Sequence, residues 1–344
     1  MRAAVYRGPN DIRIETVPVP RIGTGELLVR VAVCGVCPTD IKKIQHGTVP
    51  PPRIFGHETA GTVVRTGARV AGFRVGDRVA LHHHVPCLDC HACRHRAFAQ
   101  CVQYKRTGIT AGFEPAGGGF AEYVRVMRFV LPGVVKIPAR NTFEEGAMLE
   151  PVNTVLKAVK RMNLLRGDAV LVAGQGPIGL MFTRLLKLGG IQVLATDLME
   201  TRLELARKLG AKWVWNPQRK AAHSAPALPA AGLDAAVIAV PSDAVLDQAV
   251  QWVRGAGQIM LFAHTKRGGR TTIDPASICV DEKDLLGSYS ADITLQREVA
   301  DVVFSRRLNV SRLITNRFPL EETAAAIQLA SAPTAESLKI LVAP

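Results

Sequence analysis

The 344-residue sequence lacks any stretch of about 18 consecutive apolar residues, the length a membrane-spanning helix needs. Its N-terminal residues also lack the apolar core of about 7 to 15 residues that marks a secretory signal. Charged residues are 21% of the chain and hydrophobic residues 48%, a composition that argues against disorder, collagen and coiled coil. We therefore expect a soluble cytoplasmic protein, with no membrane partner and with enough chain for two domains.

Long basic runs are missing too, although the chain has 43 Lys and Arg against 29 Asp and Glu, a net charge of +14. The densest basic groups are short and have no interleaved aromatic residues: Arg94-His95-Arg96, Lys105-Arg106 and Lys266-Arg267. A nucleic-acid surface normally combines a basic face with aromatic stacking platforms. We therefore expect no nucleic-acid partner, whereas a small anionic ligand stays compatible with the charge.

The seven cysteines do not form the even set that is typical of a secreted disulfide framework. Four of them fall within 15 residues: Cys87, Cys90, Cys93 and Cys101. Tetrahedral zinc holds four sulfur atoms at ~2.3 Å, and such crowding suits it. Four thiolates leave no position for water, so this zinc is predicted to be structural. We expect Cys34 and Cys279 to be buried and inert.

The chain has two successive patterns of predicted secondary structure. Up to about residue 150, short strand-like runs alternate with Gly/Pro turns, which predicts a mostly antiparallel, partly closed β-barrel domain. From about residue 165, buried strands alternate with helices, which predicts a doubly wound parallel sheet. Two helices and a strand follow, and there is neither an internal repeat nor a long low-complexity linker. The predicted fold class is α/β with these two kinds of domain.

A glycine-rich turn joins the first strand of the second part, Ala169–Ala173, to a helix. The turn is predicted to bind a dinucleotide through Gly174, Gly176, Pro177, Ile178 and Gly179. Gly174 permits a tight turn, Gly176 lets a pyrophosphate approach the backbone, and Gly179 lets the helix pack closely on the strand. The helix N-terminus supplies N–H groups for the anion.

The next predicted strand ends at Asp197, 23 residues after Gly174. A carboxylate there can accept hydrogen bonds from both ribose hydroxyls, and it would repel a 2′-phosphate. NAD is therefore favoured over NADP. Arg202, on the following helix, is a candidate for contact on the adenine side.

Three short segments offer ligands for a second metal ion. They are Gly35-Val36-Cys37-Pro38-Thr39-Asp40, Gly56-His57-Glu58 and Met148-Leu149-Glu150-Pro151. Together Cys37, His57 and Glu150 supply a thiolate, an imidazole and a carboxylate. That set predicts a three-ligand zinc with an open fourth position, as in catalytic zinc sites.

These segments resemble the zinc-dependent medium-chain alcohol and polyol dehydrogenases, in the order in which that family carries them and over essentially the whole chain. The Leu149-Glu150-Pro151 junction looks more like the sorbitol and threonine dehydrogenase branch. The resemblance makes Cys37 and His57 zinc ligands, and Glu150 the third ligand or a partner through water. It makes Glu58 an outer or exchanging ligand, and Thr39 the hydroxyl that relays the substrate proton.

The net charge of the predicted zinc site indicates whether Glu58 and Glu150 can bind the metal together. Zn²⁺ with one thiolate, one neutral imidazole and one carboxylate sums to zero, whereas binding both Glu58 and Glu150 would make the site negative and weaken its Lewis acidity. We therefore expect only one of them to be fully bound at a time.

The resemblance implies a catalytic domain over residues 1–151 with a zinc lobe at 85–105, an NAD-binding domain over 152–290, and a return to the catalytic domain over 291–344. It implies two zinc ions per chain, NAD as cofactor, and hydride transfer from a secondary alcohol such as a polyol, cyclitol or sugar derivative. A dimer or tetramer of identical chains is expected. Two alternatives stay open: an amino-alcohol substrate such as threonine, and an NAD-binding zinc protein without turnover.

Two positions depart from the family pattern. Lys42 stands where a histidine often completes the proton relay, and His46, the ribose hydroxyls or water would have to replace it. Pro38 stands where glycine is common, which stiffens the turn and removes an N–H donor.

Overall fold

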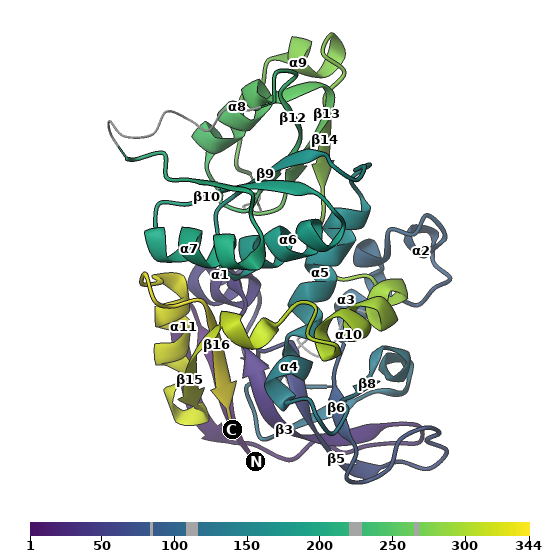
Figure 1. The fold of residues 1–344 in the computed structure, drawn as a ribbon. Helices are drawn as coiled ribbons and strands as arrows, with labels where there is room; N and C mark the ends of the chain where they lie inside the picture. The colour runs from purple at the N-terminus through teal and green to yellow at the C-terminus, as the bar shows by residue number, and fades with distance from the viewer. Residues whose placement is uncertain (83–84, 108–115, 220–228, 265–267) are drawn as a thin grey trace. The chain divides into compact units, whose positions relative to one another are not determined.

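The computed structural model describes residues 1–82, 85–107, 116–219, 229–264 and 268–344 (Figure 1). The chain forms two compact units: one comprises Met1–Asn153 with Ser290–Pro344, and the other comprises Thr154–Tyr289. The described part of the chain has no helix that is both long enough and apolar enough to cross a membrane.

The first unit is built on a seven-stranded sheet in the order β15-β16-β3-β5-β6-β8, with β7 also paired to β3. The pairs are antiparallel except β15 with β16. Its strands are β3 (Leu27–Gly35), β5 (Glu58–Thr66), β6 (Arg78–Ala80), β7 (Tyr123–Val126), β8 (Val135–Lys136), β15 (Ile314–Pro319) and β16 (Lys339–Ala343). A second sheet, ordered β2-β1-β4, contains β1 (Arg2–Gly8), β2 (Asp11–Thr16) and β4 (Arg53–Ile54).

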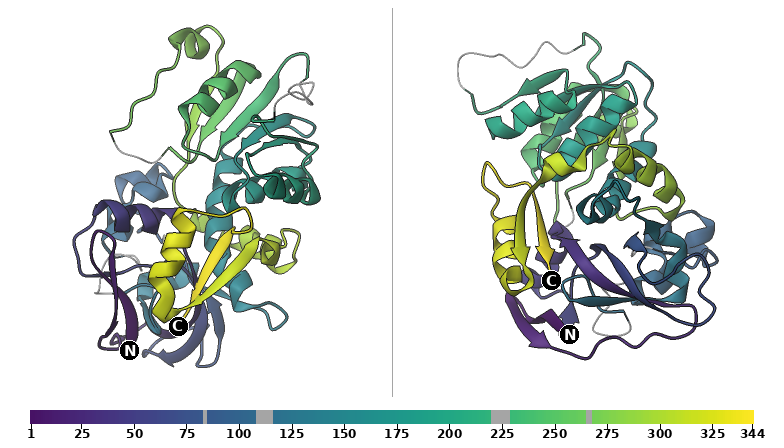
Figure 2. Two further views of the ribbon diagram at one scale, coloured as in Figure 1. Left: turned by 90° about the vertical axis from the view of Figure 1, so that its left-hand side faces the viewer. Right: turned by 60° about the horizontal axis from the view of Figure 1, so that its bottom comes forward.

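The last strand lies in the middle of this unit, since Leu341 and Val342 of β16 pair with Gly35 and Cys34 of β3. Figure 2 shows the late strands beside the early ones. The unit's helices are α1 (Pro38–His46), α2 (His91–Arg94), α3 (Val102–Thr107), α4 (Phe143–Ala147), α10 (Gln296–Phe304) and α11 (Thr323–Ser331). The helix α5 (Leu149–Lys160) carries the chain out of the unit.

Buried polar side chains tie the early and late parts of the first unit together. The Asn153 amide donates to Gln296 Oε1 at 2.9 Å and to the Asp292 carbonyl at 3.0 Å, and Asn153 Oδ1 accepts from the Asp292 N–H at 2.8 Å. Arg306 likewise donates to Glu145, the residue that completes the capping box of α4. A buried amide with all these partners stabilises one arrangement of the two segments.

The second unit is a six-stranded parallel sheet in the order β11-β10-β9-β12-β13-β14. Its strands are β9 (Ala169–Ala173), β10 (Gln192–Thr196), β11 (Trp213–Trp215), β12 (Leu233–Ile238), β13 (Val253–Leu261) and β14 (Asp284–Gly287). Its helices are α6 (Pro177–Leu188), α7 (Glu200–Leu209), α8 (Asp243–Trp252) and α9 (Pro275–Cys279). All five residues of β9 are buried, as expected for a central strand with both faces covered.

The predicted fold class is confirmed: an antiparallel β domain accompanies a doubly wound parallel sheet. The sequence patterns did not indicate β4 or β8, because a two-residue strand leaves no alternation to detect. They also did not indicate α5 or β15.

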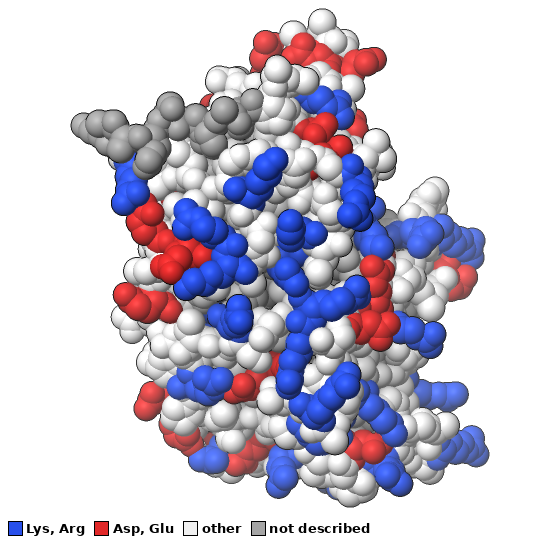
Figure 3. All heavy atoms as spheres, viewed as in Figure 1, with Lys and Arg blue, Asp and Glu red and all other residues white. Residues whose placement is uncertain are grey.

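The surface carries both signs of charge. On the face shown in Figure 3, Lys and Arg side chains are widely distributed and acidic side chains lie among them. Some are paired, as Arg2 is with Glu122 and Arg7 with Glu15.

Candidate metal and nucleotide sites

The turn between β3 and α1 presents Cys37 at the end of a strand. Cys37 is the N-cap of α1, and its carbonyl accepts from the N–H groups of Asp40 at 3.0 Å and Ile41 at 3.2 Å. Pro38 occupies the first position of the helix, where the N–H has no helical partner in any case. The departure from glycine at Pro38 is therefore compatible with the helix start.

His57 and Glu58 reach the same place from the neighbouring strand. Glu58 begins β5 and pairs with Gly35 of β3, which brings both residues next to Cys37. One ligand atom from each of Cys37, His57 and Glu58 can be chosen so that all three lie within 4.8 Å of one another. Glu150 is buried at the start of α5 but is not part of this group.

Gly35 and Lys339 fix the position of Glu58. A Cβ atom on Gly35 would lie 1.8 Å from Glu58 Oε2, so no larger residue fits there while Glu58 keeps its place. The buried Lys339 ammonium pairs with the same Oε2 and donates to the Val36 carbonyl at 2.9 Å. The Glu58 carboxylate is thus close to the thiol of Cys37 and the imidazole of His57 and is paired with the ammonium of Lys339.

Asp40 orients the imidazole of His57. Asp40 is fully buried, and its Oδ2 lies 3.1 Å from His57 Nδ1. This arrangement leaves Nε2 as the ligand atom, as in the carboxylate–histidine pairs of metal sites. Burial lowers the pKa of His57, but the negative charges of Asp40 and Cys37 outweigh that effect and raise the pKa well above its usual value.

The buried cluster has an excess of acidic groups that a divalent cation would balance. Burial raises the pKa of Glu150 to about 7, while His57 lowers it and the nearby charge of Glu58 raises it. Among the residues that the structure describes, the permanent cation beside Cys37, Asp40, Glu58 and Glu150 is Lys339. The donor set of thiolate, imidazole and carboxylate matches that of a zinc site, so the residues fit the metal.

The four clustered cysteines also lie close together. Ligand atoms of Cys87, Cys90, Cys93 and Cys101 all lie within 4.8 Å of one another. The Sγ atoms of Cys90 and Cys93 are 3.5 Å apart, and those of Cys87 and Cys93 are 3.9 Å apart. Sulfur atoms at ~2.3 Å from a tetrahedral zinc would be ~3.8 Å apart, so the spacing fits a four-thiolate cage.

Backbone N–H groups stabilise the thiolate form of one cysteine in this cage. The N–H groups of Asp89 and Cys90 lower the pKa of Cys87 to about 6, whereas burial raises that of Cys93 to about 12. Of the two remaining cysteines, Cys34 is buried as predicted, but Cys279 is exposed at the end of α9. The prediction that Cys279 is buried was therefore wrong: the short helix that carries it has no buried residue.

The glycine-rich turn of the second unit has the geometry that the sequence indicates. Gly174 has φ = 90°, and a Cβ atom there would lie 2.4 Å from Val240 Cγ1. A Cβ on Gly179 would lie 1.8 Å from the Gly174 carbonyl oxygen. Nothing lies within 4 Å of a Cβ on Gly176, so the backbone is open there to an approaching group. Pro177 and Ile178 begin α6 directly after it.

Asp197 lies beside this turn, directly after β10. Its Oδ2 accepts from the Gln175 N–H at 2.6 Å, and its Oδ1 accepts from the Met199 N–H at 2.9 Å. The buried Gln175 side chain donates to the Val172 carbonyl at 2.8 Å and accepts from the Thr183 hydroxyl at 2.9 Å. Sequence reasoning did not identify this role of Gln175, because its partners lie on the strand and the helix that the turn connects.

Both halves of the chain match families of known proteins. Residues 23–139 match the alcohol dehydrogenase GroES-like domain, and residues 177–305 match the zinc-binding dehydrogenase family. The sorbitol dehydrogenase of Bombyx mori is 30% identical over an alignment of 351 positions, gaps included. The alignment covers 99% of this chain and 97% of that protein. The chain belongs to the zinc-dependent medium-chain alcohol and polyol dehydrogenases.

Solved structures of other dehydrogenases support this placement. A zinc-binding dehydrogenase from Sinorhizobium meliloti bound to NADP is 28% identical with a TM-score of 0.89; the match covers 100% of this chain and 99% of that one. The 2R,3R-butanediol dehydrogenase from Bacillus subtilis is 27% identical with a TM-score of 0.86, with the same coverage.

The remaining residues predicted from the dehydrogenase pattern lie on two helices. Thr39 is half-buried in the first turn of α1, Lys42 is half-buried in the second turn, and His46 is exposed at the last position. Arg202 lies in the first turn of α7, half-buried. Besides Gln175, sequence reasoning missed Asp40 and Lys339 as functional candidates.

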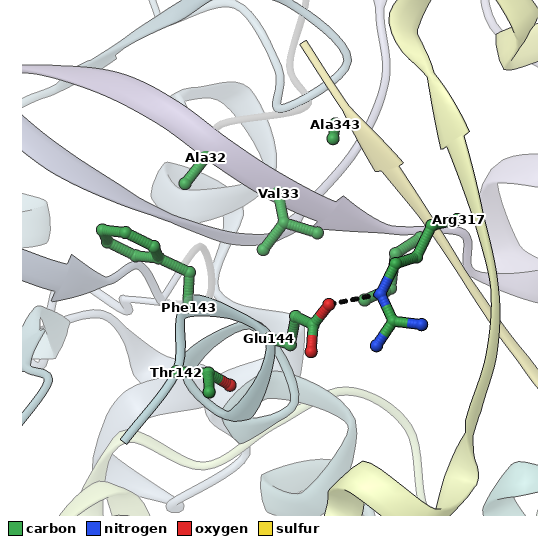
Figure 4. A pocket seen from close by; sticks show the side chains of 8 residues that line it. Ala32, Val33, Thr142, Phe143, Glu144, Arg317 and Ala343 are labelled. Carbon is green, nitrogen blue, oxygen red and sulfur yellow. Dashed lines mark hydrogen bonds and ion pairs between the residues drawn. The ribbon is translucent and has the colours of Figure 1, made fainter. Parts of the chain in front are cut away.

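A separate cavity of about 380 Å³ lies in the first unit of this dehydrogenase (Figure 4). Its lining is mostly apolar, and one ion pair joins Glu144 and Arg317 across it. None of the clustered ligand residues lines it: the lining residues are Ala32, Val33, Thr142, Phe143, Glu144, Arg317, Leu341 and Ala343. The cavity is distinct from the metal clusters.

Proposed function

We propose that this protein is an NAD-dependent zinc dehydrogenase that oxidises a secondary alcohol of the polyol, cyclitol or sugar class. The observation that carries the proposal is the buried group of Cys37, His57 and Glu58, in which Lys339 pairs with Glu58, in a chain that also has a dinucleotide turn. The relatives named sorbitol dehydrogenase support the substrate class. In this proposal the first unit carries the chemistry and the second binds NAD.

Two zinc ions per chain are proposed. Cys87, Cys90, Cys93 and Cys101 would hold a structural ion, and Cys37 and His57 would hold a catalytic one. The close approach of Glu58 to these two ligands favours it as the third ligand, with Glu150 alongside as the alternative carboxylate. Bound zinc would supply a Lewis acid that lowers the pKa of the alcohol.

Side chains of the first unit would transfer the substrate proton and orient the metal ligand His57. The Thr39 hydroxyl would accept the alcohol proton and pass it on, while Asp40 keeps His57 in its binding orientation. The ammonium of Lys42 has no lone pair with which to accept a proton, and His46 is exposed to solvent. The proton would therefore leave through His46, a ribose hydroxyl or water.

Asp197 and Arg202 would set the choice of cofactor. Asp197 would accept from the adenosine ribose hydroxyls and repel a 2′-phosphate, and Arg202 would contact the adenine side. NAD, when bound, would accept the hydride from the alcohol carbon.

A substrate panel tests the proposal. NADH absorbance is followed with zinc-loaded protein, NAD or NADP, and polyols, amino alcohols or simple alcohols. The proposal expects turnover with NAD and at least one polyol. Turnover with threonine alone would establish the amino-alcohol alternative, and NADH binding without any turnover would establish the non-catalytic one.

We further propose a homo-oligomer, a dimer or tetramer, in the cytoplasm. In the described part of the chain β14 is an edge strand, and apolar side chains are exposed on and near it: Ile278, Val280, Leu285 and Tyr289. Such an edge can pair with its copy around a two-fold axis. All seven cysteines are unbridged, which suits a reducing compartment. Sedimentation equilibrium should show association that Leu285→Lys weakens.

A further inference from the structure

Two histidines lie on the exposed face of α2, the short helix that also carries part of the four-cysteine cage (Figure 1). His91 is the first residue of α2, and His95 is the residue that ends it. The His95 N–H donates to the His91 carbonyl at 3.2 Å, so the two positions are one helical turn apart. Cys93, midway between them, is buried on the opposite face and belongs to the cage.

The two imidazoles contact each other in a position that is open to solvent. Their ring centres are 4.5 Å apart, and the ring planes are inclined at 59° to each other. Both residues are exposed. Among the residues that the structure describes, neither ring has a hydrogen-bond or ion-pair partner. The ring nitrogens of His91 and His95 are therefore accessible to a ligand from solution.

The separation of the rings matches that of two imidazoles bound to one metal ion. A metal ion at ~2.1 Å from a ring nitrogen lies ~3.2 Å from the centre of that ring. Two rings at a right angle around the ion then have centres ~4.5 Å apart, whereas the wider tetrahedral angle gives ~5.2 Å. The observed 4.5 Å agrees with the right-angle value. Histidines four residues apart on one helical face are also the spacing that binds zinc in the His-Glu-x-x-His motif.

The charges around the pair are of both signs. The guanidinium of Arg94 pairs with Asp89 at 3.0 Å, and Arg96 is exposed. With zinc bound, the cage would carry a formal charge of about −2, because four thiolates outweigh one Zn²⁺. Since Cys93 projects from the same helical turn, this charge lies within about one helix diameter, ~10 Å, of the two rings. It offsets the repulsion that the arginines exert on a cation.

We propose that His91 and His95 form a third metal site, which binds one divalent transition-metal ion on the surface of the cysteine lobe. Each imidazole supplies one nitrogen, and water molecules complete the coordination. A right angle between two nitrogen ligands suits the tetragonal or octahedral geometry of Ni²⁺ and Cu²⁺ better than the tetrahedral geometry of Zn²⁺. The site goes beyond the proposed dehydrogenase function, since it needs neither NAD nor the catalytic zinc.

Titration with Ni²⁺ tests the site in the full-length, zinc-loaded protein after excess zinc has been removed. Calorimetry should show one saturable Ni²⁺ site per chain, and elemental analysis of the same sample should show that the zinc is retained. His91→Gln and His95→Gln should each raise the Kd for Ni²⁺ at least 10-fold. Losing only the hydrogen-bonding partner of a metal ligand costs about 10- to 100-fold in affinity, so losing the ligand itself should cost no less.

A variant that keeps two histidines but changes their spacing is the matched control. His95→Gln combined with Arg96→His moves the second imidazole to the residue after the one that ends α2, away from the face of His91. The same change removes a positive charge, which by itself would favour a cation. Binding as weak as in His95→Gln would therefore show that the spacing of the two rings, and not their number, makes the site.

Four results would overturn the proposal. They are the absence of a saturable Ni²⁺ site in wild type, an unchanged Kd in His91→Gln, wild-type affinity in the variant with altered spacing, and release of one zinc for each Ni²⁺ bound. The last would mean that Ni²⁺ enters the cysteine cage. Zinc-loaded protein without zinc at the four cysteines would instead contradict the proposed structural zinc, and comparison of wild type with His91→Gln would still decide the histidine site.

Discussion

Replacing Gly35 by alanine adds a single methyl group at the point where Glu58 approaches β3. The new Cβ would lie 1.8 Å from Glu58 Oε2 and 2.9 Å from Lys339 Cε. An unstrained contact needs about 3.5 Å, so the carboxylate must move by about 1.7 Å or the strand must shift. Gly35 does not have a positive φ, so the backbone itself accepts alanine. The perturbation therefore acts on Glu58 and its ion pair.

The expected result of Gly35→Ala is a selective loss of the catalytic metal. If Glu58 is the third ligand, its displacement should weaken that zinc by roughly 10- to 100-fold and lower kcat with a polyol by a similar factor. Metal analysis after dialysis against a graded chelator should show one zinc lost and the four-cysteine zinc kept. Gly8→Ala is the control, because nothing lies within 4 Å of its Cβ.

A melting temperature close to that of wild type would separate this effect from general overpacking, which costs ~1–3 kcal/mol. Gly35→Ala with two tightly held zinc ions and wild-type kcat would refute the placement of Glu58 at the metal.

The other predictions concern the same site and its cofactor. Cys90→Ser should lose one zinc together with thermal stability, whereas Cys37→Ala should lose the other while circular dichroism shows the fold intact. Asp197→Ala should erode the preference for NAD, mainly by raising the Kd for NAD; wild-type protein that uses NADP better would contradict the role given to Asp197. Thr39→Val should lower kcat by roughly 10²-fold in a chemistry-limited assay while Thr39→Ser retains most activity, and an unchanged rate for Thr39→Val would exclude it from the relay. In metal-free protein the raised pKa of Glu150 keeps this carboxyl protonated in the folded state at pH values where the unfolded chain ionises it. Chemical denaturation should therefore show stability falling as pH rises from about 4.5 to 7, and Glu150→Gln should remove this component.

The parts of the candidate sites that could be predicted from the sequence are formed by residues that lie close together along the chain. The spacing of Cys87, Cys90, Cys93 and Cys101 predicts a cage because a chain this short can bring four sulfur atoms to one point. The roles of the glycines in the turn after β9 follow from local geometry, and the clashes at Gly174 and Gly179 agree with them.

The parts that sequence reasoning missed come from distant segments. Lys339 reaches Glu58 from a strand 281 positions away, and no local pattern marks a lysine as the partner of a buried glutamate. Asp40 stands in a motif next to Thr39, but its contact with His57 depends on the antiparallel pairing of β3 with β5. The resemblance gave Glu150 priority over Glu58, whereas the register of those strands brings Glu58 to the cluster.

The position of β16 in the middle of the first sheet has a consequence for biosynthesis. Residues 154–289 form a continuous unit that can fold as soon as it leaves the ribosome. The first sheet cannot close until β16 has been made, since that strand pairs with β3 and brings Lys339 to Glu58. Until then Glu58 lacks the ammonium that pairs with it. A nascent chain stalled before residue 339 should therefore bind a dinucleotide before it can complete its buried metal centre.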